Sequence, residues 1–353
     1  MTPLMRILRT RIAAEGPIPV ADFMAESLLH PVHGYYATRD PLGARGDFTT
    51  APEISQMFGE LIGLCLAQSW LDQGAPASFT LAELGPGRGT MMADILRATA
   101  RVPGFHDAAG IYLVEASATL RARQAEVLAG HAPTWLDNAA DLPDAPLWLV
   151  ANEFFDALPI RQYVRNGAAW CERRVGQSDE GLRFGSAAPA PVSALAHRLD
   201  DAKDGDLVEH CPAATTIIQT VGQRIADHGG AALIADYGDW RSLGDTLQAL
   251  QAHASVDPLA APGEADLTAH VDFEALARAT PSAHTRLTTQ GVFLERLGIT
   301  ARAQQLAEVL SGTARESHIA AHRRLTHPSE MGTLFKLLGL FPQTAPPPPG
   351  LDA

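Results

Sequence analysis

The decapeptide LAELGPGRGT, residues 81–90, contains the residues that are best suited to chemistry. Its glycines Gly85, Gly87 and Gly89 alternate with other residues directly after an apolar run that is typical of a buried strand. A glycine-rich turn between a strand and a helix lets the backbone approach a nucleotide closely. The dinucleotide fingerprint G-x-G-x-x-G has its third glycine where this chain has Thr90, so the match to a pyrophosphate-binding turn is incomplete.

Two carboxylates narrow the choice of ligand. Glu115 ends the next predicted strand, where a carboxylate can accept hydrogen bonds from both hydroxyls of a ribose. Glu83 lies at the end of the first strand beside the glycine turn, and its charge suits an ammonium group better than a pyrophosphate. We therefore predict S-adenosylmethionine as the cofactor, with its ribose at Glu115 and its amino-acid end at the glycine turn.

A second group of polar residues follows the apolar run PLWLVAN. Asn152, Glu153 and Asp156 come at the end of this predicted strand. Because ligands bind at the carboxyl ends of parallel strands, we expect these side chains at the same edge as the glycine turn. The alternative interpretation is that the acids cap or solvate the next helix start, and it applies chiefly to Asp156.

The elements that must position these residues alternate along the chain. Apolar runs typical of buried strands cover 79–84, 111–116, 132–136, 146–152 and 231–238. The stretches TMMADILRATA and LRARQAEVLAG, which follow the first two runs, have the spacing of amphipathic helices. Strands alternating with helices predict an α/β fold with a mostly parallel sheet.

The chain divides into five predicted segments. These are an N-terminal helical or lid segment at 1–75, the first half of a Rossmann-like core at 76–160, an insertion at 161–210, the second half of the core at 211–341 and a disordered proline-rich tail at 342–353. Within the insertion, Asn166 and Gly167 separate alternating segments and predict a hairpin turn.

The segment RGDFTTAPE contains a predicted helix start. Thr50 and Glu53 fit the S/T-x-x-E capping box, and Pro52 suits the first helical turn because it has no N–H to lose there. Apolar residues at helical spacing follow. The sequence therefore predicts a helix that begins near Pro52.

Composition excludes several classes of partner. The 353 residues include 40 acidic and 27 basic side chains, and this charge of -13 argues against nucleic acid or an anionic membrane as a partner. No apolar run approaches the ~20 residues that span a bilayer, and the N-terminus lacks a secretory signal peptide, so we expect a cytoplasmic protein without membrane insertion. The 3 cysteines are too scattered for a zinc site or a disulfide framework, and we expect no metal.

Several segments together carry a resemblance to a known family. HGYYATRDPLGARGDFTTAPEISQMFGE, ELGPGRGT, NEFFDALP, ADYG and PGEADLTAHVDF, in that order, resemble the MidA family. These are class I S-adenosylmethionine-dependent methyltransferases related to the mitochondrial complex I assembly-factor protein arginine methyltransferase. The resemblance spans roughly residues 5–341. It implies a Rossmann-like, seven-stranded, mostly parallel sheet, an N-terminal helical segment over the cofactor and an inserted substrate or interaction region.

The resemblance also implies partners and a place for the N-terminal block. It implies a protein substrate, for which a quinone-module subunit of complex I is one candidate, and it leaves a homodimer open. It places the helix start at Glu53 over the cofactor, so Glu53 is predicted to bind it. Arg45 and Asp47 would then belong to a loop that closes on the bound ligand.

Methylation of arginine would give the carboxylates a role. A guanidinium is charged at physiological pH and has no free lone pair, so carboxylates must orient it and hold its charge away from the reacting nitrogen. Glu153 and Asp156 are the predicted catalytic residues for this task, with Glu53 as a third candidate. His270 beside Asp272 is the predicted acceptor of the released proton. The alternative is that both residues merely begin a helix.

We therefore predict a protein arginine methyltransferase that depends on S-adenosylmethionine. One alternative is a cofactor-binding assembly chaperone with little catalysis, which the intact glycines and Glu153 disfavour. Another is an NAD-dependent oxidoreductase, which Thr90 in the glycine turn disfavours.

Overall fold

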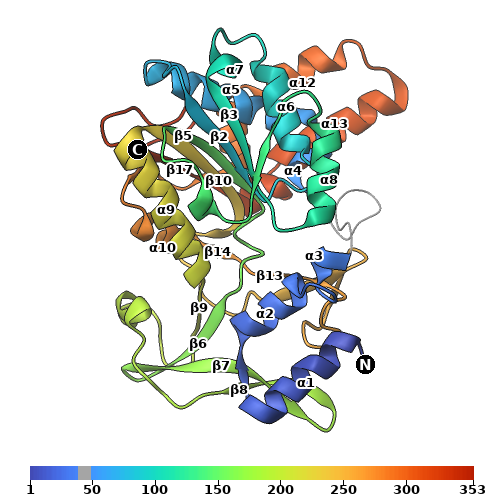
Figure 1. The fold of residues 1–353 in the computed structure, drawn as a ribbon, viewed down its shortest axis with the longest axis vertical. Coiled ribbons are helices and arrows are strands. Elements are labelled where there is room, and N and C mark those ends of the chain that lie inside the picture. The colour runs from blue at the N-terminus through green and yellow to red at the C-terminus, as the bar shows by residue number, and fades with distance from the viewer. Residues whose placement is uncertain (39–48) are drawn as a thin grey trace. The chain divides into compact units, whose positions relative to one another are not determined.

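The chain folds into two compact units in a computed structural model that describes residues 1–38 and 49–353 (Figure 1). Unit 1 comprises Met1–Phe48, Asp156–Ala214 and Asp239–Glu274, and unit 2 comprises Thr49–Phe155, Thr215–Gly238 and Ala275–Ala353. The predicted closing loop with Arg45 and Asp47 lies outside the described residues. Within the described ranges, no helix is both long and apolar enough to cross a membrane.

Unit 2 contains the predicted sheet. Its strands follow the order β15 (Ala283–His284), β17 (Phe335–Phe341), β10 (Gly230–Asp239), β5 (Leu147–Asn152), β2 (Phe79–Leu84), β3 (Ala109–Val114) and β4 (Thr134–Leu136), and β16 (Thr288–Thr289) pairs with β17. All pairs from β10 to β4 are parallel, whereas β17 runs antiparallel to β10 and β15. The predicted α/β fold with a mostly parallel sheet is confirmed, and its path has seven strands within the described residues.

The strand order changes direction at one place in this sheet. From β2 the chain continues to β3 on one side, and it later returns to β5 on the other side of β2. The connections after these two neighbouring strands therefore diverge, and ligands of such sheets bind at the carboxyl ends of the strands at this point. The segments that follow β2 and β5 are the glycine turn and NEFF.

Helices flank this sheet (Figure 1). They are α4 (Ala51–Ile54), α5 (Gln56–Asp72), α6 (Thr90–Thr99), α7 (Phe105–Ala108), α8 (Ala118–Val127), α11 (Gln290–Arg296), α12 (Ile299–Ala307), α13 (Gly312–Thr326), α14 (Met331–Leu334), the 3-10 turn η1 (Ala139–Asp141) and most of α9 (Pro212–His228) and α10 (Phe273–Ala279). Glycines let α5 and α6 approach closely, because a Cβ on Gly59 would lie 2.6 Å from the Cβ of Asp94. An aromatic cluster of Trp70, Phe79, Phe105 and Trp148 fills the adjoining core.

The predicted helix start near Pro52 is confirmed, but the capping box is not formed. Thr50 is the N-cap of α4 without a side-chain hydrogen bond, and the Glu53 carboxylate accepts a hydrogen bond from Thr90 Oγ1 at 2.5 Å instead. The helix also breaks at Ser55, whose hydroxyl accepts from the N–H of Met57 and starts α5. A tertiary partner for Glu53 has therefore replaced the local one.

Unit 1 contains both the N-terminal helices and the predicted insertion. It contains α1 (Pro3–Glu15), α2 (Val20–Leu29), α3 (Tyr35–Thr38), the 3-10 helix η2 (Ser193–Leu199), β1 (Ile18–Pro19), β6 (Arg161–Asn166), β7 (Ala169–Ser178), β8 (Gly181–Ser186), β9 (Leu207–His210), β11 (Gln248–Gln251), β12 (Ala254–Val256), β13 (Asp266–Thr268) and β14 (Val271–Asp272). An antiparallel sheet runs in the order β1-β7-β6-β9, with β8 on β7. The hairpin between β6 and β7 is confirmed, and its last pair is Asn166 with Ala169.

The proline-rich end of the chain differs from the predicted disordered tail. Leu351 is only 6% exposed and belongs to the core of unit 2. The Asp352 carbonyl accepts a hydrogen bond from the N–H of Arg286 at 2.7 Å. Prolines prevent a regular ladder, but burial of Leu351 and hydrogen bonds to the carbonyls of Pro349, Gly350 and Asp352 hold this segment in place.

Candidate active site

The glycine turn after β2 requires its glycines. Gly85, Gly87 and Gly89 have φ values of 62°, 53° and 82°, a region that side chains with a Cβ rarely adopt. A Cβ on Gly85 would lie 2.8 Å from the ring of Phe154, so the turns after β2 and β5 touch. The Gly87 carbonyl accepts a hydrogen bond from the side chain of Gln124 at 2.7 Å.

Glu115 follows the end of β3 and is held by neutral donors. Its carboxylate accepts from the N–H of Ser117 at 2.8 Å and from Nε2 of Gln124 at 3.2 Å. Gln124 is fully buried and in turn accepts from the Trp135 indole at 2.8 Å. Burial raises the pKa of Glu115. Gln124 thus ties the glycine turn to the predicted ribose ligand, a role that nothing in its polar helix sequence indicated.

Glu83 and Asn152 supply buried acceptors at the ends of β2 and β5. Among the described residues, Glu83 Oε2 and Asn152 Oδ1 are buried oxygens without a hydrogen-bond partner. Burial raises the pKa of Glu83 to about 8, because a carboxylate without water is costly to ionise. Two buried acceptors beside a glycine cradle fit the ammonium end of S-adenosylmethionine.

Glu153 occupies a strained position directly after β5. Its φ of 50° is uncommon for a residue with a side chain and costs about 1–3 kcal/mol. Its N–H donates to the Ala235 carbonyl at 2.9 Å, which continues the pairing of β5 with β10. Its carboxylate accepts from the N–H of Ala51 at 3.0 Å and from Nδ2 of Asn152 at 3.1 Å. The structure therefore fixes both the backbone and the carboxylate of Glu153.

Glu53 lies beside the glycine turn. Its carboxylate accepts from Thr90 Oγ1, the first residue of α6, and approaches the Arg88 guanidinium at 3.8 Å. A dinucleotide turn binds phosphate at the start of this helix. A carboxylate at that position would repel a phosphate, which agrees with the missing third glycine. Across residues 1–38 and 49–353, no cluster of three or more His, Cys, Asp or Glu side chains could hold a metal ion.

Asp156 and His270, the other predicted catalytic residues, belong to unit 1. Asp156 is buried, and its carbonyl accepts from the N–H of Ala269 at 2.9 Å. The N–H of His270 donates to Thr246 Oγ1 at 2.8 Å. Their predicted roles stay predictions.

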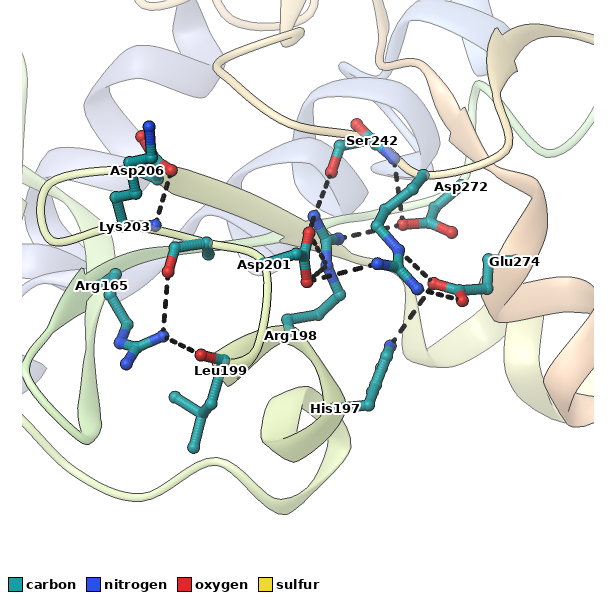
Figure 2. Close-up of polar contacts among 12 residues, drawn as sticks. Arg165, His197, Arg198, Leu199, Asp201, Lys203, Asp206, Ser242, Asp272 and Glu274 are labelled. Atoms are coloured by element: carbon teal, nitrogen blue, oxygen red, sulfur yellow. Dashed lines mark hydrogen bonds and ion pairs between the residues drawn. The ribbon is translucent and has the colours of Figure 1, made fainter.

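Asp272, the predicted partner of His270, has a structural task. Its carboxylate accepts from the Arg198 guanidinium at 3.4 Å and from the N–H of Ser242 at 3.2 Å (Figure 2). Arg198 is only 1% exposed, so Asp272 supplies part of the charge that its burial requires.

Known proteins resemble this chain over nearly its whole length. Residues 61–292 match the model of a family described as "Putative S-adenosyl-L-methionine-dependent methyltransferase". The mouse protein named "Protein arginine methyltransferase NDUFAF7, mitochondrial" is 38% identical over 97% of this chain and 85% of its own length, and the human protein of that name is 36% identical over 97% and 84%. The chain belongs to this methyltransferase family.

A solved structure supports the same assignment. A protein from Burkholderia thailandensis bound to S-adenosyl-homocysteine is 31% identical, with a TM-score of 0.82 over 99% of this chain and 92% of its own. The predicted family, fold and cofactor of the methyltransferase are thereby confirmed.

The prediction of a cytoplasmic protein is wrong, because relatives at 36–38% identity are named as mitochondrial proteins. That prediction rested on the lack of a secretory signal peptide and of a membrane span. Neither property distinguishes one aqueous compartment from another. Targeting signals are recognised by receptors, and the properties of the folded domain do not reveal them.

Proposed function

We propose that this methyltransferase transfers a methyl group from S-adenosylmethionine to an arginine side chain of a protein substrate. The observation that carries the proposal is the carboxylate of Glu153, which two hydrogen bonds fix directly after β5, where the following turn touches the glycine turn. The relatives named protein arginine methyltransferases support the choice of arginine.

The cofactor would be held by the edge of the sheet in unit 2. The turn at Gly85, Gly87 and Gly89 would cradle it, Glu115 would accept from its ribose, and Glu83 and Asn152 would accept from its ammonium group. Glu53, which already holds Thr90, would keep the start of α6 in place and discourage phosphate ligands. When bound, S-adenosylmethionine supplies an electrophilic methyl carbon on a sulfonium.

Glu153 would act on the substrate guanidinium. A guanidinium keeps its charge in proteins, so a carboxylate at one edge of the fork orients it and localises positive charge away from the nitrogen that reacts. The donors from Ala51 and Asn152 limit the positions available to the Glu153 carboxylate, and this restriction favours a single orientation of the substrate.

The finer assignments belong to the same proposal. We assign a second guanidinium contact to Asp156 and acceptance of the released proton to His270, each testable by substitution to Asn. The target that the family resemblance implies is a quinone-module subunit of respiratory complex I, and a homodimer is the proposed oligomeric state.

Two substitutions test the proposal. Glu153→Gln keeps shape but removes charge, and we expect methyl transfer to fall by about 10²–10³-fold with cofactor affinity nearly unchanged. Gly87→Val forces a branched residue into positive φ and should abolish cofactor binding. Glu126→Gln, an exposed carboxylate on α8, is the control.

The measurements are calorimetry with S-adenosylmethionine and with NAD, and methylarginine analysis by mass spectrometry. Radiolabelled cofactor is added to extracts of cells that lack the gene, with and without the purified enzyme. The methylation of complex I subunits in the two samples is then compared. Turnover at the normal rate in Glu153→Gln would remove this residue from the mechanism. Heat evolved with NAD alone would overturn the methyltransferase, and cofactor binding without any methyl transfer would favour an assembly chaperone.

A further inference from the structure

A buried carboxylate next to Glu153 has no role in the steps above. Asp236 lies near the end of β10, in the ADYG segment, and is fully buried. One carboxylate oxygen accepts from the N–H groups of Phe154 at 3.2 Å and Phe155 at 2.9 Å, and the other accepts from the N–H of Tyr237 at 2.9 Å. Three main-chain donors thus converge on one side chain.

Two of these donors belong to the residues that directly follow Glu153. The N–H of Glu153 itself donates to Ala235, the residue before Asp236. Consecutive positions of β10 therefore bind the chain at Glu153, Phe154 and Phe155. Three successive N–H groups are therefore fixed against the end of one strand, which leaves little freedom for the backbone torsions between them. These bonds hold Glu153 at its φ of 50°.

A charged carboxylate suits this task better than an amide. Its two oxygens offer acceptor sites in several directions, whereas an amide offers one oxygen and one NH2 group, which would face an N–H donor. Hydrogen bonds to a charged acceptor also contribute more than neutral ones. The strain at Glu153 requires compensation of this kind, since such conformations persist only where the surroundings impose them.

We propose that Asp236 is a positioning residue for methyl transfer, which sets the backbone of Glu153 and thereby the direction of its carboxylate. This inference rests on the proposed function, because it assigns a purpose to Glu153. Asp236 acts through the Phe154 and Phe155 amides and makes no contact with substrate in this role.

The test compares Asp236→Asn with the wild-type enzyme. Misplacing a catalytic group by about 1 Å can cost up to about 100-fold in rate, so we expect kcat to fall by about 10–100-fold. The Kd for S-adenosylmethionine should change much less than kcat, because Asp236 binds the main chain of Phe154 and Phe155 and reaches the glycine turn only indirectly, through the Phe154 ring. Amide hydrogen exchange at Phe154 and Phe155 should become faster.

Two further variants separate positioning from a general loss of stability. Asp94→Asn removes another buried carboxylate of unit 2, and it should leave kcat unchanged even where it lowers the melting temperature. In a Glu153→Gln background, Asp236→Asn should cause no additional loss of kcat, because the group that it positions is already absent. Should Asp236→Asn fail to fold, Asp236→Glu keeps the charge and displaces the same amides by one methylene, with a smaller fall in kcat expected.

The outcomes are distinct. A folded Asp236→Asn enzyme with normal kcat, while Glu153→Gln is inactive, overturns the positioning role and leaves the proposed function intact. An equal fall in kcat from Asp236→Asn in the wild-type and Glu153→Gln backgrounds also overturns the positioning role, because Asp236 would then act through a residue other than Glu153. Normal turnover in Glu153→Gln instead overturns the proposed role of Glu153.

Discussion

Two polar regions of the molecule hold their carboxylates in opposite ways. In unit 1, the buried Arg198 guanidinium donates to Asp201 at 3.1 Å and to Asp272 at 3.4 Å (Figure 2). Arg241 is paired with Asp201 and with Glu274, which His197 also approaches at 3.9 Å. Positive and negative groups of this unit therefore compensate one another.

At the edge of the sheet in unit 2, Glu53 approaches the Arg88 guanidinium at 3.8 Å, but three other carboxylates accept the hydrogen bonds described here from neutral groups. The donors to Glu115, Glu153 and Asp236 described above are main-chain N–H groups and side-chain amides. Such donors orient a carboxylate without cancelling its charge. The Arg198 network therefore pairs opposite charges, whereas the described donors at the sheet edge orient carboxylates at the place where we propose that cationic ligands bind.

The largest expected effect comes from removing Arg198. Arg198→Met leaves Asp201 and Asp272 without their shared cation, and breaking a buried ion pair costs about 3–5 kcal/mol. We expect the free energy of unfolding to fall by that amount while the Kd for S-adenosylmethionine at low temperature stays unchanged. Denaturant unfolding and calorimetry measure the two quantities. The exposed pair of Arg123 with Glu126 provides the control Arg123→Met, with a cost below about 1 kcal/mol.

The opposite result is expected for Glu115→Gln. A hydrogen bond to a charged group contributes about 1.5–3 kcal/mol, so cofactor affinity should fall by about 10–100-fold. Stability should change by less than about 1 kcal/mol, because burial already disfavours the charged form of Glu115. A melting temperature that collapses with affinity preserved would show that Glu115 resembles the carboxylates of the Arg198 network.

The smallest expected effect is the release of a proton from Glu83 when the cofactor binds. Its pKa of about 8 means that the free enzyme holds a proton there at pH 7, and an ammonium beside it would favour the ionised form. Cofactor binding should then release a large fraction of one proton at pH 7. Calorimetry in two buffers of different ionisation enthalpy measures this release, and Glu83→Gln should abolish it. Equal heats in both buffers would contradict the assignment.

Glu83 also predicts a pH dependence of stability. Its folded pKa lies above the value of about 4.3 for an unfolded glutamate, so the folded state binds the proton more tightly. The free energy of unfolding should therefore fall as the pH rises from about 4 to 8 and level off above that range. Glu83→Gln should remove this contribution.

The local pattern of the sequence was sufficient to predict the main strands and to suggest part of the candidate site. The alternation of apolar runs predicted β2, β3, β4, β5 and β10. Because parallel strands place their carboxyl ends at one edge, the glycine turn, Glu83, Glu115 and Glu153 were predicted to lie there together. Residues whose side chains bind a segment far away in the sequence were not predicted. Gln124 binds Gly87 across 37 positions, and Asp236 binds Phe155 across 81.

The sequence by itself therefore determined the fold class, the family and the edge of the sheet at which the chemistry should occur. The tertiary structure alone decided which donors each carboxylate receives. Glu53 leaves its predicted capping box for Thr90, and Asp272 is bound by Arg198. Periodicity and turn preferences depend on neighbours along the chain, whereas hydrogen-bond partners and pKa shifts depend on burial, which exists only after distant segments have packed together.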